Sequence, residues 1–159
     1  MESSIRRVVA GEIPEVLALA WRVFSRFEAP EYASEGVEEF RRFLEEDNIR
    51  ERMRSGGMVL WGWYEGNEVA GMIAVTETGH INLLFVDAEF HRRGIGRALH
   101  HTAMDHFRKI GVSKVTVNSS PYAVEIYRRL GFAPVSAERT VSGIRFTPME
   151  LFLAPEAAD

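Results

Sequence analysis

Cysteine is absent from the 159-residue sequence. Its absence excludes disulfide bonds, thiolate metal sites and a cysteine nucleophile. The sequence also has no run that approaches the ~18 apolar residues of a membrane-spanning helix, and its first residues contain no apolar segment typical of a secretion signal. We therefore expect a cytoplasmic protein that does not enter a membrane.

An excess of positive charge is absent as well. The formal net charge is -4 and the isoelectric point is about 5.8, which makes nucleic acid an unexpected partner. Three of the five histidines, His100, His101 and His106, lack the i, i+4 spacing of a metal-binding pair, so we expect surface or boundary positions for them and no metal site. Hydrophobic residues make up 46% of the sequence, which predicts one folded domain over residues 1–159.

Apolar periodicity predicts alternating helices and strands. Helices are expected over about 14–27, over a second segment that Ser34 caps and that reaches 44, over 94–110 and over 121–130. One more helical turn is expected in the charged segment 47–55. Strands are expected over 5–9, 58–64, 69–76, 80–86 and 114–118, with a closing pair at 133–139 and 144–153. The strand–helix–strand unit over 81–118 predicts a right-handed crossover between parallel strands, and the flanking hairpins make the α/β sheet mixed.

A strand, a glycine turn and a helix start follow one another near the middle of the sequence. The apolar run 81–86 is followed by Gly94 and Gly96, and Arg92, Arg93 and Arg97 flank these glycines. Glycine permits close approach to a ligand, and the first amides of a helix lack internal partners and bind anions. Guanidinium groups suit phosphate oxygens. The pattern predicts a site for a phosphorylated ligand, although turn glycines beside solvated arginines would look similar.

Two common nucleotide motifs do not fit this turn. The dinucleotide fingerprint requires a third glycine at the position that Leu99 occupies, and a P-loop requires a lysine, whereas no lysine precedes Lys109. We therefore expect a phosphorylated ligand that is bound through neither the dinucleotide fingerprint nor a P-loop.

The sequence resembles the GNAT N-acetyltransferase superfamily over nearly its full length. Members carry Gln/Arg-x-x-Gly-x-Gly/Ala at the strand–helix turn, where this sequence has His91-Arg-Arg-Gly-Ile-Gly96. Members also carry a later segment like Asn-x-x-Ala-x-x-x-Tyr-x-x-x-Gly-Phe, which corresponds here to Ser120 through Phe132. The resemblance, to a poorly characterised bacterial subgroup of small members, implies a single-domain GNAT fold. Its mixed sheet would have six to seven strands, a splayed parallel pair and about four flanking helices.

The resemblance implies acetyl-CoA as co-substrate and assigns residues to it. Cofactor contacts are expected from Leu84, Phe85, Val86, His91, Arg92, Arg93, Gly94, Ile95, Gly96, Arg97, Ala98, Asn118, Ser120 and Tyr127. The pyrophosphate would lie on the amides that begin the helix, and the amide-rich arm of CoA would pair with the splayed strand. Ser120 departs from the family's asparagine, so Asn118 is expected to take over part of that contact.

The same resemblance suggests catalytic roles. Tyr127 occupies the position of the family's catalytic tyrosine, and a phenol can donate a proton to the departing thiolate. His80 matches the place of a catalytic glutamate in several members and can accept an ammonium proton. Glu77 and a water chain are the alternatives for this base.

The acceptor is expected to be a small-molecule primary amine whose identity the sequence does not give. Its pocket would lie between the first two helices and the strand ends, with Phe24, Phe27, Tyr32 and Trp63 as lining or core residues. Two hypotheses for the function follow: an acetyl-CoA-dependent N-acetyltransferase, or a non-catalytic acyl-CoA sensor on the same fold. A homodimer is compatible with either hypothesis.

Overall fold

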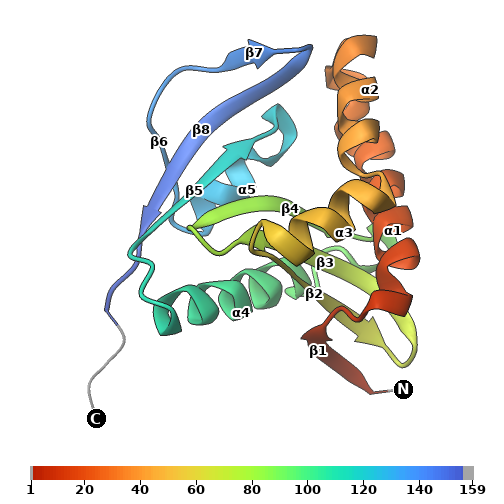
Figure 1. Cartoon of the computed structure of the whole chain (residues 1–159). Helices are drawn as coiled ribbons and strands as arrows, with labels where there is room; N and C mark the ends of the chain where they lie inside the picture. The colour runs from red at the N-terminus through yellow and green to blue at the C-terminus, as the bar shows by residue number, and fades with distance from the viewer. Residues whose placement is uncertain (1, 156–159) are drawn as a thin grey trace.

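The computed structural model describes residues 2–155, which form a mixed sheet covered by helices on both faces (Figure 1). The strands are ordered β1-β2-β3-β4-β5-β8-β6, and β7 pairs with β8 to complete the eight-stranded sheet. Their bounds are β1 Ser3–Arg7, β2 Met58–Glu65, β3 Glu68–Thr76, β4 His80–Val86, β5 Lys114–Ser119, β6 Ala133–Pro134, β7 Arg139–Val141 and β8 Ile144–Phe152. The predicted α/β class with a parallel crossover is confirmed, with one strand more than the upper expectation.

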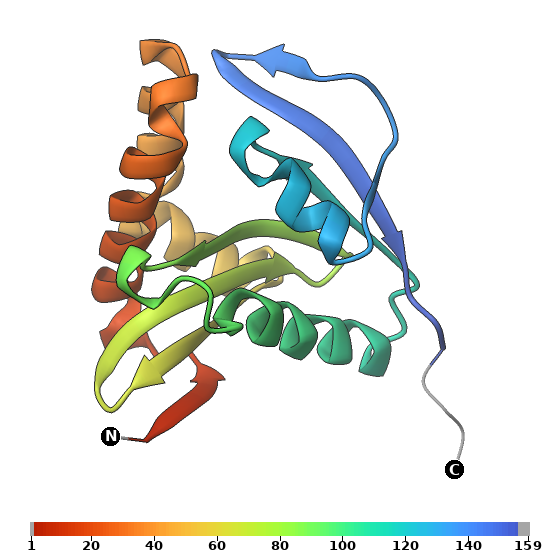
Figure 2. The ribbon, with the colours of Figure 1, turned by 180° about the vertical axis from the view of Figure 1, so that it is seen from behind.

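Five α-helices divide between the two faces of the sheet. They are α1 Ile13–Phe27, α2 Ser34–Phe43, α3 Glu46–Ser55, α4 Ile95–Lys109 and α5 Val124–Arg129. The helices α1, α2 and α3 share one apolar core with the sheet, while α4 and α5 pack on the opposite face, as Figure 2 shows from behind. Helices on both faces therefore bury apolar side chains against the sheet.

Several local expectations were wrong in detail. The segment 47–55 belongs to a ten-residue helix, although only Ile49 is buried there. Ser34 is the first residue of α2, not its cap, and Ala33 takes the cap position without a side-chain hydrogen bond. The helix predicted over 121–130 is a 3-10 turn followed by the short α5. His100 is 7% exposed and packs edge-on against Phe132, so it is a core residue.

A bulge in β4 changes which side chains face each core. The register with β3 pairs Ala74 with Leu83 and Val75 with Ile81, so Asn82 has no direct partner. Ile81 packs in the α4 core and Leu83 in the α1 core, although residues two apart in a regular strand share a face. The extra residue thus reverses the alternation along the rest of β4.

The parallel strands β4 and β5 separate just beyond this bulge. Their pairing is confined to His80 with Thr116 and Ile81 with Val117. From Asn82 onward, β4 keeps its partner β3 but has no paired strand on its β5 side. The expected splayed parallel pair is therefore confirmed, and it leaves a free strand edge inside the molecule.

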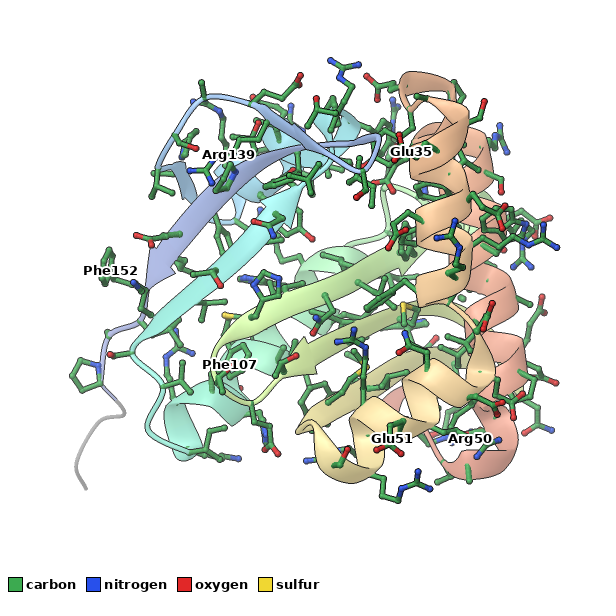
Figure 3. The ribbon with its side chains drawn as sticks, turned by 45° about the horizontal axis from the view of Figure 1, so that its top comes forward. Glu35, Arg50, Glu51, Phe107, Arg139 and Phe152 are labelled. Atoms are coloured by element: carbon green, nitrogen blue, oxygen red, sulfur yellow. The ribbon has the colours of Figure 1, made fainter. Side chains whose placement is uncertain are left out.

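The hairpin of β7 and β8 reaches over to α2. Its two-residue turn, Ser142-Gly143, has positive φ angles of 52° and 78°, which matches a twisted hairpin. A Cβ added to Gly36 of α2 would lie only 2.1 Å from the carbonyl oxygen of Gly143. Glycine at both positions therefore lets the hairpin tip lie directly against α2, near Glu35 in Figure 3.

Candidate active site

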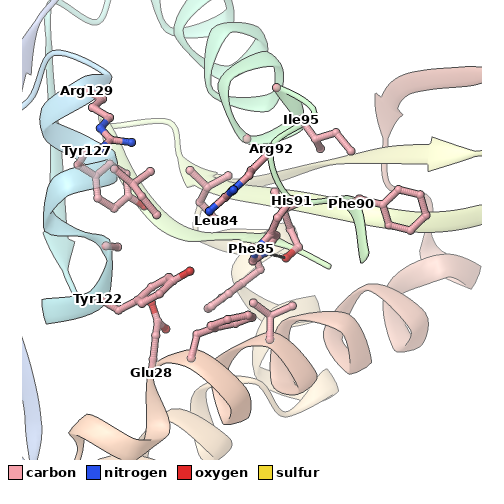
Figure 4. A pocket seen from close by; sticks show the side chains of 17 residues that line it. Glu28, Leu84, Phe85, Phe90, His91, Arg92, Ile95, Tyr122, Tyr127 and Arg129 are labelled. Carbon is pink, nitrogen blue, oxygen red and sulfur yellow. Dashed lines mark hydrogen bonds between the residues drawn. The ribbon is translucent and has the colours of Figure 1, made fainter. Parts of the chain in front are cut away.

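A cleft of about 590 Å³ opens where β4 and β5 separate. Its walls come from the end of β4, the start of α4, the segment around α5 and the end of α1 (Figure 4). The lining residues are Val23, Phe27, Glu28, Leu84, Phe85, Val86, Phe90, His91, Arg92, Gly94, Ile95, Gly96, Tyr122, Ala123, Ile126, Tyr127 and Arg129. Four elements that are distant in the sequence thus meet around one cavity.

The loop before α4 is shaped for an anion. Gly94 caps α4 with a φ angle of 77°, and Arg92 also has a positive φ angle of 66°, which is uncommon for a residue with a side chain. The Nε2 atom of His91 donates to the carbonyl oxygen of Val86 at 2.8 Å and closes the loop onto β4. The first amides of α4 are therefore left free beside the cleft.

The geometry around Gly96 fits a ligand that lies close to the backbone. A Cβ placed there would meet only Val86, at 3.6 Å, which is ordinary van der Waals contact. Neither packing nor backbone conformation therefore requires glycine within the protein. The open space lies on the cleft side, where a side chain would occupy the approach to the α4 amides.

The predicted cofactor residues divide into two groups. Those that line the cleft are Leu84, Phe85, Val86, His91, Arg92, Gly94, Ile95, Gly96 and Tyr127. Those that do not line it are Arg93, Arg97, Ala98, Asn118 and Ser120. Within the second group, the guanidinium of Arg93 lies 5.2 Å over the ring of Phe90, and Asn118 is exposed on β5.

Tyr127 lies on the α5 wall of the cleft and is 5% exposed. Burial, with a smaller contribution from the charge of Glu28, raises the pKa of Tyr127 well above its usual value. Among residues 2–155, its hydroxyl makes no hydrogen bond to another side chain or to the backbone. The phenol is therefore held protonated and is available to a ligand.

Glu28 is a cleft residue that the sequence reasoning missed. It ends α1, and one carboxylate oxygen accepts a 2.6 Å hydrogen bond from the Ser120 hydroxyl. Burial raises the pKa of Glu28 to about 7, and the nearby charge of Glu31 acts in the same direction. No arginine, lysine or histidine forms an ion pair with Glu28 in the described part of the chain. Ser120, expected at the cofactor, instead holds this carboxyl group.

The sequence profile of the acetyltransferase (GNAT) domain matches residues 28–153. The chain belongs to the GNAT family. Family membership makes it an acyltransferase, with acetyl-CoA as the donor. A comparison with curated proteins gave no significant match.

Solved structures of GNAT proteins share the fold. A GCN5-related N-acetyltransferase from Rhodopseudomonas palustris is 18% identical, with a TM-score of 0.80 over 96% of this chain and 97% of that one. The PaiA N-acetyltransferase from Thermoplasma acidophilum, solved with coenzyme A, is 18% identical, with a TM-score of 0.79 over 96% of this chain and 100% of that one. The ribosomal-protein-S18-alanine N-acetyltransferase from Escherichia coli is 16% identical, with a TM-score of 0.66 over 99% of this chain and 97% of that one.

The two residues expected as base in this GNAT chain lie outside the cleft lining. His80 begins β4, and its Nδ1 atom is 2.7 Å from the Thr116 hydroxyl at the closed end of the splay. Burial lowers the pKa of His80 below its usual value. Glu77 is hydrogen-bonded at 2.7 Å to His106, near the end of α4 away from Gly94. Glu77 thus contacts the far end of the helix that begins at the cleft.

The four aromatic residues considered for the acceptor pocket of the GNAT fold have different positions. Phe27 lines the cleft, and its ring lies 5.3 Å from that of Tyr122. Phe24 is fully buried in the α1 core, and Tyr32 packs against it. Trp63 packs in the α4 core, where its indole donates to Glu65. Of these four residues, Phe27 is therefore the one that lines the cleft.

The described residues of this GNAT chain lack two further features. Over residues 2–155, no helix is both long enough and apolar enough to cross a membrane. The same residues hold no group of three or more histidine, aspartate or glutamate side chains placed to bind a metal ion.

Proposed function

We propose that this GNAT protein moves the acetyl group of acetyl-CoA directly to the primary amine of a small molecule, with Tyr127 as general acid. One observation carries the proposal. A single cleft is lined by the free edge of β4, the first residues of α4 and the protonated phenol of Tyr127. A donor site, a carbonyl-binding strand and a proton donor are the parts that acetyl transfer requires.

The pyrophosphate of the donor would be held by the start of α4. The amides that begin α4, ahead of the Ala98 amide that donates to Gly94, and the positive end of the helix dipole would bind its oxygens. Arg92 would add a guanidinium from within the cleft. The absence of a side chain at Gly96 would leave room for the phosphates against the backbone.

The unpaired edge of β4 would hold the rest of the donor. From Leu84 to Val86, amides and carbonyls on the β5 side can pair with an amide-rich arm as an added strand would. A β4 amide could also bind the thioester oxygen and stabilise negative charge that develops on it during attack. Tyr127 would protonate the departing sulfur, since its raised pKa keeps the proton on the phenol.

A binding titration and an activity assay test the proposal. Isothermal titration with acetyl-CoA measures donor binding, and thiol release across a panel of primary amines measures transfer. We expect saturable acetyl-CoA binding and amine-dependent thiol release. Failure to bind acetyl-CoA would refute the proposed function, whereas binding without turnover on any amine would identify the chain as an acyl-CoA sensor.

A further inference from the structure

Among residues 2–155, Glu28 is the one acidic side chain that lines the cleft. It lies on the α1 side, whereas Arg92 and Arg129 lie toward α4 and α5 (Figure 4). The anionic and cationic parts of the lining are therefore separated. The cationic part suits the phosphates of the donor, so the carboxylate marks a different end of the cavity.

The surroundings of Glu28 leave it without a compensating cation. Within the described part of the chain, its only hydrogen bond from another side chain comes from Ser120, and Glu31 adds a second negative charge nearby. The tyrosines close enough to feel its charge are Tyr32, Tyr122 and Tyr127. His91 lies beside Phe27. No cationic group of residues 2–155 pairs with this carboxylate. A partly buried carboxylate in this state is stabilised most by a cation from outside the chain.

Aromatic rings border the same end of the cleft. Phe27 and Tyr122 stack with their ring centroids 5.3 Å apart, and Phe27 also lies 5.1 Å from the ring of His91. Apolar surface comes from Val23 and Phe85. An ammonium group with an apolar body matches this combination, because the carboxylate binds the charge and the rings contact the rest.

We propose that Glu28 binds the ammonium group of the acceptor and accepts its first proton, which selects primary amines that carry an apolar body and no carboxylate beside the nitrogen. This inference rests on the proposed acetyl transfer. A carboxylate next to the amine would face the like charges of Glu28 and Glu31. The acceptor class is therefore defined by charge as well as by shape.

Each proton in the proposed transfer has a defined donor and acceptor. The ammonium gives one proton to the Glu28 carboxylate, and the neutral nitrogen attacks the acetyl carbonyl carbon. The carbon–sulfur bond breaks, and the sulfur takes the proton of the Tyr127 hydroxyl. The nitrogen gives a second proton back to the Tyr127 oxygen through water, and Glu28 releases its proton to solvent. One ammonium and one thioester thus yield one amide, one thiol and one proton.

The position of Glu28 favours it over His80 for this step. Glu28 lines the same cavity as Tyr127 and Leu84, whereas His80 lies outside the lining and is bound to Thr116. A base with a pKa near neutrality accepts an ammonium proton with a smaller penalty than an ordinary carboxylate would. Burial gives Glu28 such a pKa, about 7.

The experiment compares Glu28→Gln with Glu31→Gln and His80→Ala. Glu31→Gln removes the same charge three positions away, outside the cleft lining. The acetyl-CoA dissociation constant is measured first, followed by kcat/KM across pH with phenethylamine and with phenylalanine, which differ by one carboxylate.

We expect wild type to prefer phenethylamine and its kcat/KM to rise with pH through about 7. Glu28→Gln should bind acetyl-CoA normally, lose about 100-fold in kcat/KM and lose this rise. The two control variants should keep the rise. Circular dichroism confirms that each variant is folded.

Three results would overturn the assignment of Glu28 while leaving acetyl transfer intact. They are an unchanged rate profile in Glu28→Gln, loss of the rise in His80→Ala alone, and equal use of phenylalanine by wild type. Acetyl-CoA binding by wild type with no acetylation of phenethylamine would also reject the acceptor class. A wild-type protein that binds no acetyl-CoA would instead refute the proposed function itself.

Discussion

Ser120 and Glu28 are 92 positions apart in the sequence and are joined by a 2.6 Å hydrogen bond at the edge of the cleft. The serine hydroxyl donates to the carboxylate and also accepts from the backbone amide of Ala123. The contact therefore ties the end of α1 to the segment that leads into α5. This bond therefore fixes the α1 wall of the cleft relative to the α5 wall.

Removal of this bond should change the ionisation of Glu28. A hydrogen bond to the charged form lowers an acid's pKa, and Ser120 acts in this direction on Glu28. Ser120→Ala should therefore raise the pKa of Glu28 above about 7 and move the rise of kcat/KM to higher pH. The pH profile with phenethylamine measures this shift. A shift to lower pH would contradict the assigned role of the serine.

Loss of the Tyr127 hydroxyl should slow turnover without weakening donor binding. Tyr127→Phe keeps the buried ring, and the hydroxyl makes no hydrogen bond within residues 2–155. General acids contribute factors of about 10²–10⁴, so we expect kcat to fall at least ~100-fold. Acetyl-CoA affinity by titration should stay within about twofold.

Tyr122→Phe is the matched control because Tyr122 lines the same cleft but is 40% exposed. It should retain most of the wild-type kcat. Equal losses in the two variants would indicate that the phenols act by packing, and unchanged turnover in Tyr127→Phe would remove Tyr127 as the acid.

Gly96→Ala should weaken acetyl-CoA binding without lowering the stability of the fold. Its Cβ would meet only ordinary contact with Val86, and alanine favours a helix over glycine by about 1 kcal/mol. We expect an equal or higher melting temperature and at least ~10-fold weaker acetyl-CoA binding, a loss of about 1.4 kcal/mol. Thermal melts and calorimetric titration measure the two effects.

Gly94→Ala should behave differently from Gly96→Ala. The φ angle of 77° at Gly94 costs a side-chain-bearing residue roughly 1–2 kcal/mol, although no atom lies within 4 Å of the added Cβ. This variant should therefore lose stability. Normal acetyl-CoA binding in Gly96→Ala would show that the donor does not lie against the first amides of α4.

Neutralisation of Glu28 should stabilise the free protein at alkaline pH. The pKa of Glu28 is raised from 4.5 to about 7, so the folded chain holds this proton more tightly than the unfolded chain. Its contribution to the free energy of unfolding therefore falls as pH rises between these values. Recovery of about 1–2 kcal/mol should make Glu28→Gln melt roughly 2–8 °C above wild type near pH 8, and close to wild type near pH 4.

Glu31→Gln is the control for this melt, and it should show no comparable gain at alkaline pH. Equal melting temperatures of Glu28→Gln and wild type near pH 8 would contradict the placement of an uncompensated carboxylate in the cleft.

Local sequence patterns predicted the elements that build the donor side of the cleft. The strand at His80–Val86 has the predicted bounds, and α4 follows the glycine turn within one residue of expectation. These features depend on neighbouring residues: an apolar run, two glycines and an apolar helical stripe. Gly131 likewise forms a left-handed stop after α5, with a φ angle of 102°.

Features that depend on tertiary contacts were not predictable in the same way. The helix α3 buries little more than Ile49, so its charged sequence shows no apolar stripe. The bulge at Asn82 arises from pairing with β3 and leaves no composition signal. Glu28 was not predictable, because it enters the cleft lining and meets Ser120 only through the tertiary arrangement.

Amide chemical shifts during an acetyl-CoA titration test the central claim most directly, because they locate the donor on the chain. A ¹⁵N-labelled sample should show saturable shifts concentrated at Leu84–Val86, at Arg92–Ala98 and around Tyr127. The amides of β1 and α3, which lie away from the cleft, should change little. Saturable shifts centred elsewhere, or no shifts at millimolar acetyl-CoA, would contradict the account.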